Sequence, residues 1–314
     1  ISPGHVLLKN QLRAAGLVSR GARSHPRSFE YAAPATSRFL AHSRERPSVI
    51  AASWSAAAFY GFGQFSDAAD TCVLSSGRRI EPAGVLHPRE RRRLAYVEPW
   101  SIHVGDDTVK TVPPLLALIG CLRSLHDEEH SWEVVRVPGL TAPRVRMIQL
   151  VDRFRRATGL NGSQVIAGSF GLFQARRLQQ IVDRSTGLSD SPQETALRLV
   201  LEQGTASLGV KLQQQIPIYK DGRIGEPGTK DAGAELLTII DLADLPRRIA
   251  YMYDGEHHLD RSQRDRDAMI TAELTRRGWL VIRISAGMLN DANTLIAQAR
   301  ESVATRDDIT RLVG

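Results

Sequence analysis

The spacing of hydrophobic and polar residues is most regular in the second half of the chain. There, apolar residues recur every three or four positions in stretches expected to be helical, and they form short runs in stretches expected to be strands. Ser191 is a favoured helix N-cap, Pro192 suits a first helical position and Gly204 a helix end. The expected elements are a helix at 191–204, strands at 211–219, 234–242 and 249–254, a helix at 262–278, a strand at 279–285 and a helix from about 291. The pattern therefore predicts an αβββαβ unit followed by a C-terminal helix.

The first half of the chain is less regular and predicts short strands between helices. Residues 1–46 are basic and poorly periodic. Helices are expected from about Pro47 to about Gly61, with residues 53–60 rich in Ala, and at 113–125, 143–158 and 170–185. Strands are expected at 71–76, 100–106 and 132–137. The pattern thus predicts an α/β protein in four parts. They are a basic N-terminal segment (1–46), an α+β region (47–135), a helical linker region (136–190) and a C-terminal α/β domain (191–314).

Composition is that of an ordinary globular protein, with 42% hydrophobic and 24% charged residues in a chain of 314, which allows a sizeable core. Cys72 and Cys121 are too few for a disulfide framework or a zinc site, and we expect both to be buried. No apolar run has the length of a membrane span and no signal peptide is evident, so a soluble, cytoplasmic location is expected. The chain opens on Ile1 rather than Met, which suggests that its start is missing.

The charge balance points to an anionic partner. The net charge is +7 and the pI is about 9.8, which is typical of proteins that bind nucleic acid or an acidic surface. Residues 1–50 carry eight Lys or Arg against two Glu, and a second basic run contains Arg89, Arg91, Arg92 and Arg93. Only five of the 41 basic residues are Lys, so the codon usage of a GC-rich genome explains the arginines equally well.

Three acidic residues lie where the predicted elements of the second half meet. Asp241 closes an apolar strand, where a charge is costly unless it is solvated or paired. Asp254 closes the next strand, so the two carboxylates meet at one sheet edge if these strands pair. Glu194 lies in the first turn of the preceding helix, beside its apolar face. Converging carboxylates favour a hard cation such as Mg²⁺, which activates water and stabilises charge on a phosphoryl oxygen.

Each of these three residues also has a purely structural interpretation. Glu194 stands at capping-box spacing from Ser191. Asp254 precedes a glycine, which makes a standard turn pair. Asp241 ends a strand and needs no other role. Only the joint placement of the three residues within one αβββαβ unit favours the catalytic interpretation.

Three stretches of the second half carry a resemblance to a known group of enzymes: SPQETALRLVL, TIIDLADLPRRIAYMYDGEHH and RDRDAMITAELTRRGWLVIRIS. They resemble the endonuclease-like domains of the PD-(D/E)XK superfamily, close to the very-short-patch mismatch repair type. The resemblance implies a restriction-endonuclease-like fold and a metal-dependent nuclease site. By analogy, Asp241, Asp254 and Glu194 would hold Mg²⁺ or Mn²⁺ with the Tyr253 carbonyl, and His258 would lie near the scissile phosphate.

The chain departs from the superfamily pattern at two positions. Met252 stands where relatives carry an acid, and a thioether cannot replace a carboxylate toward Mg²⁺. Asp254 stands where the superfamily usually has Lys. The mismatch repair branch also lacks an acid at the first of these positions, so the departure leaves both an active and an inactive nuclease open.

The first half resembles a different family. The stretches PSVIAASWSAAAFYGF, LSSGRRIEPAGVLHPRERRRL and DDTVKTVPPLLALIGCLRSL are similar to AbiEi-type antitoxins, which in actinobacteria often precede nuclease-like domains. Relatives usually begin with a winged helix, of which residues 1–46 would be a remnant. The resemblance implies that the chain binds DNA, or a protein partner, in a toxin–antitoxin or phage-defence system.

Two functions therefore stand against each other. The first is a Mg²⁺-dependent DNA endonuclease, in repair or phage defence, in which the basic first half positions the duplex. The second is a non-catalytic, antitoxin-like DNA-binding regulator with a degenerate nuclease fold. An RNA-processing enzyme is a weaker third interpretation.

Overall fold

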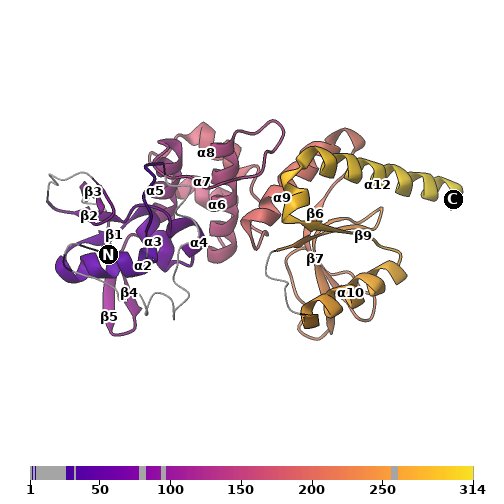
Figure 1. The fold of residues 1–314 in the computed structure, drawn as a ribbon, viewed down its shortest axis with the longest axis horizontal. Helices are drawn as coiled ribbons and strands as arrows, with labels where there is room; N and C mark the ends of the chain where they lie inside the picture. The colour runs from indigo at the N-terminus through magenta and orange to yellow at the C-terminus, as the bar shows by residue number, and fades with distance from the viewer. Residues whose placement is uncertain are drawn as a thin grey trace. The chain divides into compact units, whose positions relative to one another are not determined.

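The computed structural model describes residues 2, 4, 26–31, 33–77, 83–92, 97–255 and 261–313. The chain has an α/β fold with two separate mixed sheets, which confirms the predicted fold class (Figure 1). It divides into two compact units, of which the first is Ile1–Glu133 with Arg146–Ser185 and the second is Val134–Val145 with Thr186–Gly314. Within the described ranges, no helix is both long and apolar enough to cross a membrane.

The first unit combines helices with a five-stranded sheet of order β3-β2-β1-β5-β4. Its strands are β1 (Ile50–Ala51), β2 (Cys72–Ser75), β3 (Arg89–Arg92), β4 (Trp100–Val104) and β5 (Asp107–Thr111). Its helices include α2 (Ala35–Glu45), α3 (Ser53–Phe59), α4 (Gly63–Ser66), α5 (Pro114–His126), α6 (Ala142–Thr158), α7 (Gly162–Gly168) and α8 (Ala175–Val182). Phe39, Ile50, Val73 and Val109 belong to its buried core, so α2 packs against the middle of the sheet.

Two predictions for the first half of the chain are wrong. The helix expected from about Pro47 begins only at Ser53, because Ile50–Ala51 forms strand β1.

The segment 132–137 forms no strand. Trp132 packs edge-on against Trp54, with ring centroids 6.2 Å apart, and its ring lies 4.9 Å from that of Phe65. Its indole N–H donates to Gln149 Oε1 at 2.8 Å. At Trp132 the apolar pattern therefore reflects side-chain packing on α3, α4 and α6 rather than backbone pairing in a sheet.

Arg38 on α2 is almost completely buried, with 1% of its surface exposed. Its guanidinium lies over the ring of Tyr31, 3.9 Å from the centroid. It donates hydrogen bonds to the carbonyls of Ala33, Ser66, Asp67 and Ala69 and to the Thr71 hydroxyl. Arg38 thereby joins α2 to the segment that enters β2.

Asp70 extends this network to the edge of the sheet. Its buried carboxylate accepts from the Tyr31 hydroxyl at 2.6 Å and from Arg89 Nη2 at 3.0 Å, and it also pairs with Arg27. Burial, and then the charge of Asp70, raises the pKa of Tyr31, which therefore remains a neutral donor. Arg89 opens β3, so the same carboxylate fixes where the edge strand begins.

The second unit has the predicted αβββαβ order, with a four-stranded sheet β6-β7-β8-β9. Strands β6, β7 and β8 pair antiparallel, and β9 pairs parallel to β8. The elements are α9 (Pro192–Thr205), the short 3₁₀ turn η2 (Ala206–Leu208), β6 (Gln213–Tyr219), β7 (Leu236–Asp244), β8 (Ile249–Asp254), α10 (Arg261–Arg276), β9 (Leu280–Ser285), α11 (Ala286–Asn290) and α12 (Ala292–Val313).

Gly204 does not end its helix, which corrects the prediction made from its position. Helix α9 runs to Thr205, and the left-handed residue that closes the following 3₁₀ turn is Gly209, with φ of +65°. A Cβ atom on Gly204 would lie 2.5 Å from Ile296 Cγ1 on α12. The glycine is therefore needed for the close packing of α9 against α12, which no local pattern could indicate.

Helix α10 covers one face of the sheet of the second unit. Leu274 and Trp279 are buried there with Ile216, Ile240 and Met252. The Trp279 N–H donates to the Leu274 carbonyl at 3.0 Å across Gly278, whose φ is +85°. This left-handed cap turns the chain from α10 into β9 and seats Trp279 in the core.

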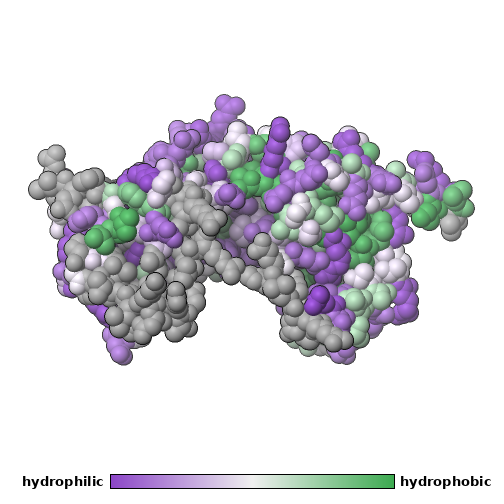
Figure 2. Space-filling model, viewed as in Figure 1, coloured by the Kyte–Doolittle hydropathy of each residue, from purple (hydrophilic) through white to green (hydrophobic). Residues whose placement is uncertain are grey.

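Hydrophilic residues cover much of the surface that is visible in Figure 2, and hydrophobic residues lie among them in smaller groups. The large hydrophobic residues that are most exposed in the described ranges, Phe170 and Leu312, belong to different units. Single exposed hydrophobic residues are normal in soluble domains.

Replacing Arg38 with Met should strongly destabilise the first unit. The change removes one cation and leaves buried carbonyls without donors, which should lower the free energy of unfolding by about 3–5 kcal/mol. Urea denaturation followed by circular dichroism measures the effect. Arg44 on the same helix pairs with Asp107 at 58% side-chain exposure, so Arg44→Met is the matched control and should change the stability little. Equal losses in both variants would contradict the assigned role of Arg38.

Candidate active site and basic strand

Asp241 lies on β7 where the pairing between β7 and β8 stops. The ladder runs from Asp244↔Ile249 to Leu242↔Tyr251, and beyond it the Tyr253 N–H donates to Asp241 Oδ2 at 2.7 Å. The side-chain carboxylate thus takes the place of a backbone acceptor as the strands separate. Contrary to the prediction from the sequence, Asp241 does not close its strand, because β7 continues to Asp244. The Tyr253 N–H gives the carboxylate a partner within the sheet.

The electrostatic surroundings of Asp241 are unusual for a carboxylate. Its side chain is mostly buried, and this burial is the main reason why its pKa is raised to about 7. The negative charge of Glu194 adds to the increase, and Asp190 and Asp254 contribute less, while the Tyr253 N–H acts in the opposite direction. Carboxylates from α9, β7 and β8 therefore act on one another at this place, and their role in binding a metal stays a prediction.

Glu194 is held at the start of α9 by several donors. Its Oε1 accepts from the Ser191 hydroxyl at 3.0 Å, and its Oε2 accepts from the Asp190 N–H at 2.9 Å. The Ser191 hydroxyl in turn accepts from the Glu194 N–H, as an N-cap does. Gln215 Nε2 donates to Oε2 at 3.0 Å. Glu194 therefore caps its helix and also reaches strand β6.

Gln215 is a site residue that sequence analysis missed. It stands opposite Asp241, between the pairs Gln214↔Leu242 and Ile216↔Ile240. Its φ of +52° is strained for a residue with a side chain, and the residue is 4% exposed. It is the last of three consecutive glutamines, and nothing in that run distinguishes it from its neighbours.

Asp254 at the end of β8 forms a two-point ion pair with Arg283 on β9. Arg283 Nε and Nη2 donate to its two oxygens at 2.9 and 2.5 Å, and Asp267 of α10 lies 3.3 Å from the same Nη2. The parallel register places Met252, not Asp254, directly opposite Arg283. The arginine thus offsets much of the charge of Asp254. The two residues are far apart in the sequence, so no local pattern indicates this ion pair.

Two further residues that the sequence analysis discussed at this site are His258 and Met252. His258 lies outside the described residues. Met252, at the position that is acidic in relatives, is 8% exposed and packs in the core beneath α10. The described residues contain no ready-made group of three His, Cys, Asp or Glu side chains around one point.

The arginines of the basic run differ in their surroundings. Arg89 is bound to Asp70 and to Glu129, whose Oε1 lies 2.8 Å from Arg89 Nη1. Arg91 shares Glu129 at 3.2 Å. Arg92 is exposed on the edge strand β3, and Arg93 lies outside the described residues. Of the described arginines of this run, Arg92 is therefore the one best placed to meet a phosphate.

Comparison with family models, with curated proteins and with solved structures finds no match to this chain.

Asp241→Asn should stabilise the metal-free protein more at pH 8 than at pH 4. The folded-state pKa of about 7 exceeds the ordinary value near 3.9, so the folded protein binds the proton more tightly than the unfolded chain does. Stability therefore falls as pH rises from about 4 to about 7, and asparagine removes this loss while retaining an acceptor for the Tyr253 N–H. The expected gain at pH 8 is about 1–3 kcal/mol.

Denaturant titration in the presence of EDTA at both pH values measures this difference. Asp221→Asn is the opposing control, because the backbone N–H and side chain of Arg223 lower the pKa of Asp221. Removing the Asp221 charge should cost stability at high pH rather than increase it. A gain from Asp241→Asn that is the same at pH 4 and pH 8 would contradict the assignment.

Proposed function

We propose that this chain is a metal-dependent DNA endonuclease whose site lies at the end of the β7–β8 pairing in the second unit. The observation that carries the proposal is that Glu194 and Asp254, from two other elements of the αβββαβ unit, act on Asp241 through their charges, while Gln215 stands opposite Asp241 and binds Glu194. The net charge of +7 supports an anionic substrate such as DNA. The resemblance of the stretches around these residues to nuclease domains supports the same reaction class.

The donor atoms at this place suit Mg²⁺ or Mn²⁺, which prefer oxygen ligands. Asp241, Asp254 and Glu194 would hold the ion together with the Tyr253 carbonyl. Asp241 uses only its Oδ2 in a hydrogen bond to the described residues, so its other oxygen is available. The bound ion would supply activation of water and stabilisation of charge on the phosphoryl oxygens. Arg283 would orient Asp254 by binding both of its oxygens.

A second function, a DNA-binding antitoxin-like regulator without catalysis, is favoured by two specific observations. Met252 is packed in the core, and the charge of Asp254 is balanced by Arg283. Both features reduce the attraction of the site for a cation. In this alternative the second unit keeps the αβββαβ arrangement as a scaffold, and the basic residues bind DNA.

Asp241→Asn should abolish cleavage of plasmid DNA in the presence of Mg²⁺ or Mn²⁺. The variant keeps the shape of the side chain and removes the charge that attracts the cation, so the rate should fall by about 10² to 10³. Gel assays of nicking on duplex, mismatched and single-stranded DNA measure it, and DNA affinity should be unchanged.

Met252→Glu restores the acid found in relatives and should increase cleavage, whereas the uncharged Met252→Gln should not. Thermal unfolding of both variants shows whether the core at this position tolerates them. If the wild-type protein, Asp241→Asn and Met252→Glu are all equally inert while DNA binding persists, the regulator is the correct function.

Arg92→Ala/Arg93→Ala should weaken DNA binding by a similar factor for all sequences. Arginine contacts to phosphate release counterions, so the slope of log affinity against log salt should become shallower by about one for each arginine–phosphate pair that is removed. Fluorescence anisotropy at several salt concentrations measures both effects. The control is Arg176→Ala/Arg177→Ala on α8, which removes the same charge elsewhere in the first unit. An equal effect of both double variants would show that only net charge matters.

A further inference from the structure

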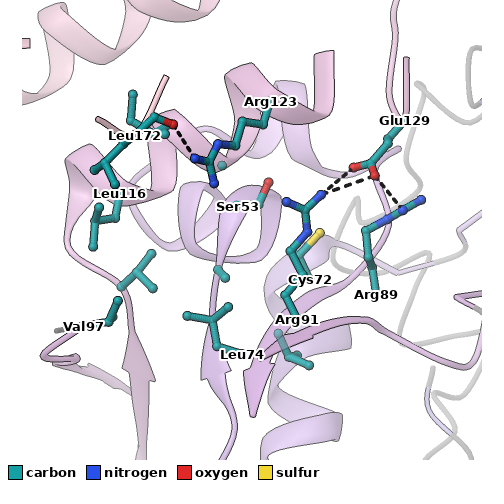
Figure 3. A pocket seen from close by; sticks show the side chains of 15 residues that line it. Ser53, Cys72, Leu74, Arg89, Arg91, Val97, Leu116, Arg123, Glu129 and Leu172 are labelled. Carbon is teal, nitrogen blue, oxygen red and sulfur yellow. Dashed lines mark hydrogen bonds and ion pairs between the residues drawn. The ribbon is translucent and has the colours of Figure 1, made fainter. Parts of the chain in front are cut away.

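A cavity of about 120 Å³ lies within the first unit, between α5, the start of α3 and the sheet. Figure 3 shows that its two sides differ in character. Arg91 and Arg123 reach toward it from β3 and α5, with the Ser53 hydroxyl between them. Leu74, Val97 and Leu116 lie to the left of and below the Ser53 hydroxyl in this view. All residues that line it belong to the first unit, and the proposed nuclease residues are not among them.

The apolar side of the cavity indicates the size and character of the apolar part of a ligand. Its lining includes Leu74, Val97, Val112, Leu116, Ile119 and Leu172, which come from the sheet, from α5 and from the segment before α8. An apolar cavity of about 150 Å³ is known to accept benzene. The body that fits is therefore a single ring or a short branched chain.

The polar side of the cavity suits a ligand whose head group carries a negative charge. Arg123 is exposed, and its Nη2 donates to the Leu172 carbonyl at 2.5 Å. Among the described residues it forms no ion pair, whereas Arg89 and Arg91 share Glu129. The lining thus contains three arginines and one carboxylate, and two of the arginines already bind that carboxylate. A planar guanidinium binds a carboxylate through two parallel hydrogen bonds, so Arg123 suits an anionic ligand.

The backbone of Ser53 has a strained conformation. Its φ is +46°, an unfavourable conformation for serine. Gly120 on α5 permits the close approach, because a Cβ atom there would lie 3.0 Å from Ser53 Cβ. Strain of this kind persists where the surroundings hold a residue in place. The Ser53 hydroxyl lies at the charged side of the cavity, where it donates a long hydrogen bond to Cys121 Sγ, at 3.8 Å, which it can exchange for a ligand.

The cavity is built for binding rather than for covalent chemistry. Cys72 contributes to its lining, but burial, and then the charge of Asp70, raises the pKa of this thiol to about 12. The nucleophilic thiolate is therefore scarce at neutral pH. Among the described lining residues there is no other cysteine and no histidine.

We propose that this cavity binds a small monocarboxylate with an apolar body of about the size of benzoate. The carboxylate contacts Arg123 and Ser53, and the ring lies among Leu74, Val97 and Leu116. One negative charge matches the one arginine of the lining that forms no ion pair with the described residues. The proposal is independent of the nuclease function, because it concerns other residues and its test needs no DNA.

Isothermal titration calorimetry on the full chain tests this with benzoate, its neutral analogue benzyl alcohol, and inorganic phosphate. Benzoate should bind with one-to-one stoichiometry and at least about tenfold more tightly than either of the others, because only benzoate satisfies both sides of the cavity. Equal binding of benzyl alcohol, stronger binding of phosphate, or no saturable binding of benzoate would each overturn the proposal.

Two variants separate the head group from the body of the ligand. Arg123→Met should weaken benzoate binding at least about tenfold and leave the binding of benzyl alcohol unchanged, and Arg176→Met on α8 is the matched control without effect. Leu116→Phe fills the cavity and should weaken the binding of both aromatic compounds. Unchanged benzoate affinity in folded Arg123→Met, as judged by circular dichroism, overturns the proposal. If that variant does not fold, the three wild-type affinities and Leu116→Phe decide it.

Discussion

A charge that leaves water must find partners inside the protein, and the arrangement of both units depends on how this requirement is met. In the first unit, Arg38 satisfies it almost completely through backbone carbonyls and the ring of Tyr31. Those carbonyls belong to the segment that leads into β2, so the arginine holds this segment against α2. Asp70 then binds Arg89 and fixes β3. Two buried charges therefore hold the segment before β2 and the start of β3 in place.

The same requirement is met less completely in the second unit. Asp241 receives one hydrogen bond from the Tyr253 N–H, but it shares its surroundings with Glu194 and Asp254. Each of these two neighbours has strong partners of its own: Gln215 and the helix start for Glu194, and Arg283 for Asp254. Of the three carboxylates, Asp241 is thus the one whose charge is least compensated. Such a group gains most from a cation, which is why the proposed metal site centres on it.

The arginines of the first unit show how similar residues acquire different tasks. Arg89 binds the buried Asp70 and the partly exposed Glu129, Arg91 shares Glu129 beside the cavity, and Arg92 is exposed. Alternation along an edge strand accounts for part of this difference, because neighbouring side chains point to opposite faces. A run of arginines in a sequence therefore does not by itself define a nucleic-acid surface. The arginine on which the proposed carboxylate site depends, Arg123, lies outside the run altogether.

Local patterns determined much of the fold. The period of apolar residues predicted the αβββαβ order of the second unit, and residue types alone predicted the N-cap at Ser191 and the burial of both cysteines, because these features depend on composition or on neighbours in sequence. The tertiary structure alone decided the rest. Gly204 serves the approach of α12, segment 132–137 packs through Trp132, and Gln215 and Arg283 bind the carboxylates. Each of these contacts joins residues far apart in the chain, and a local pattern carries no information about which distant groups will meet.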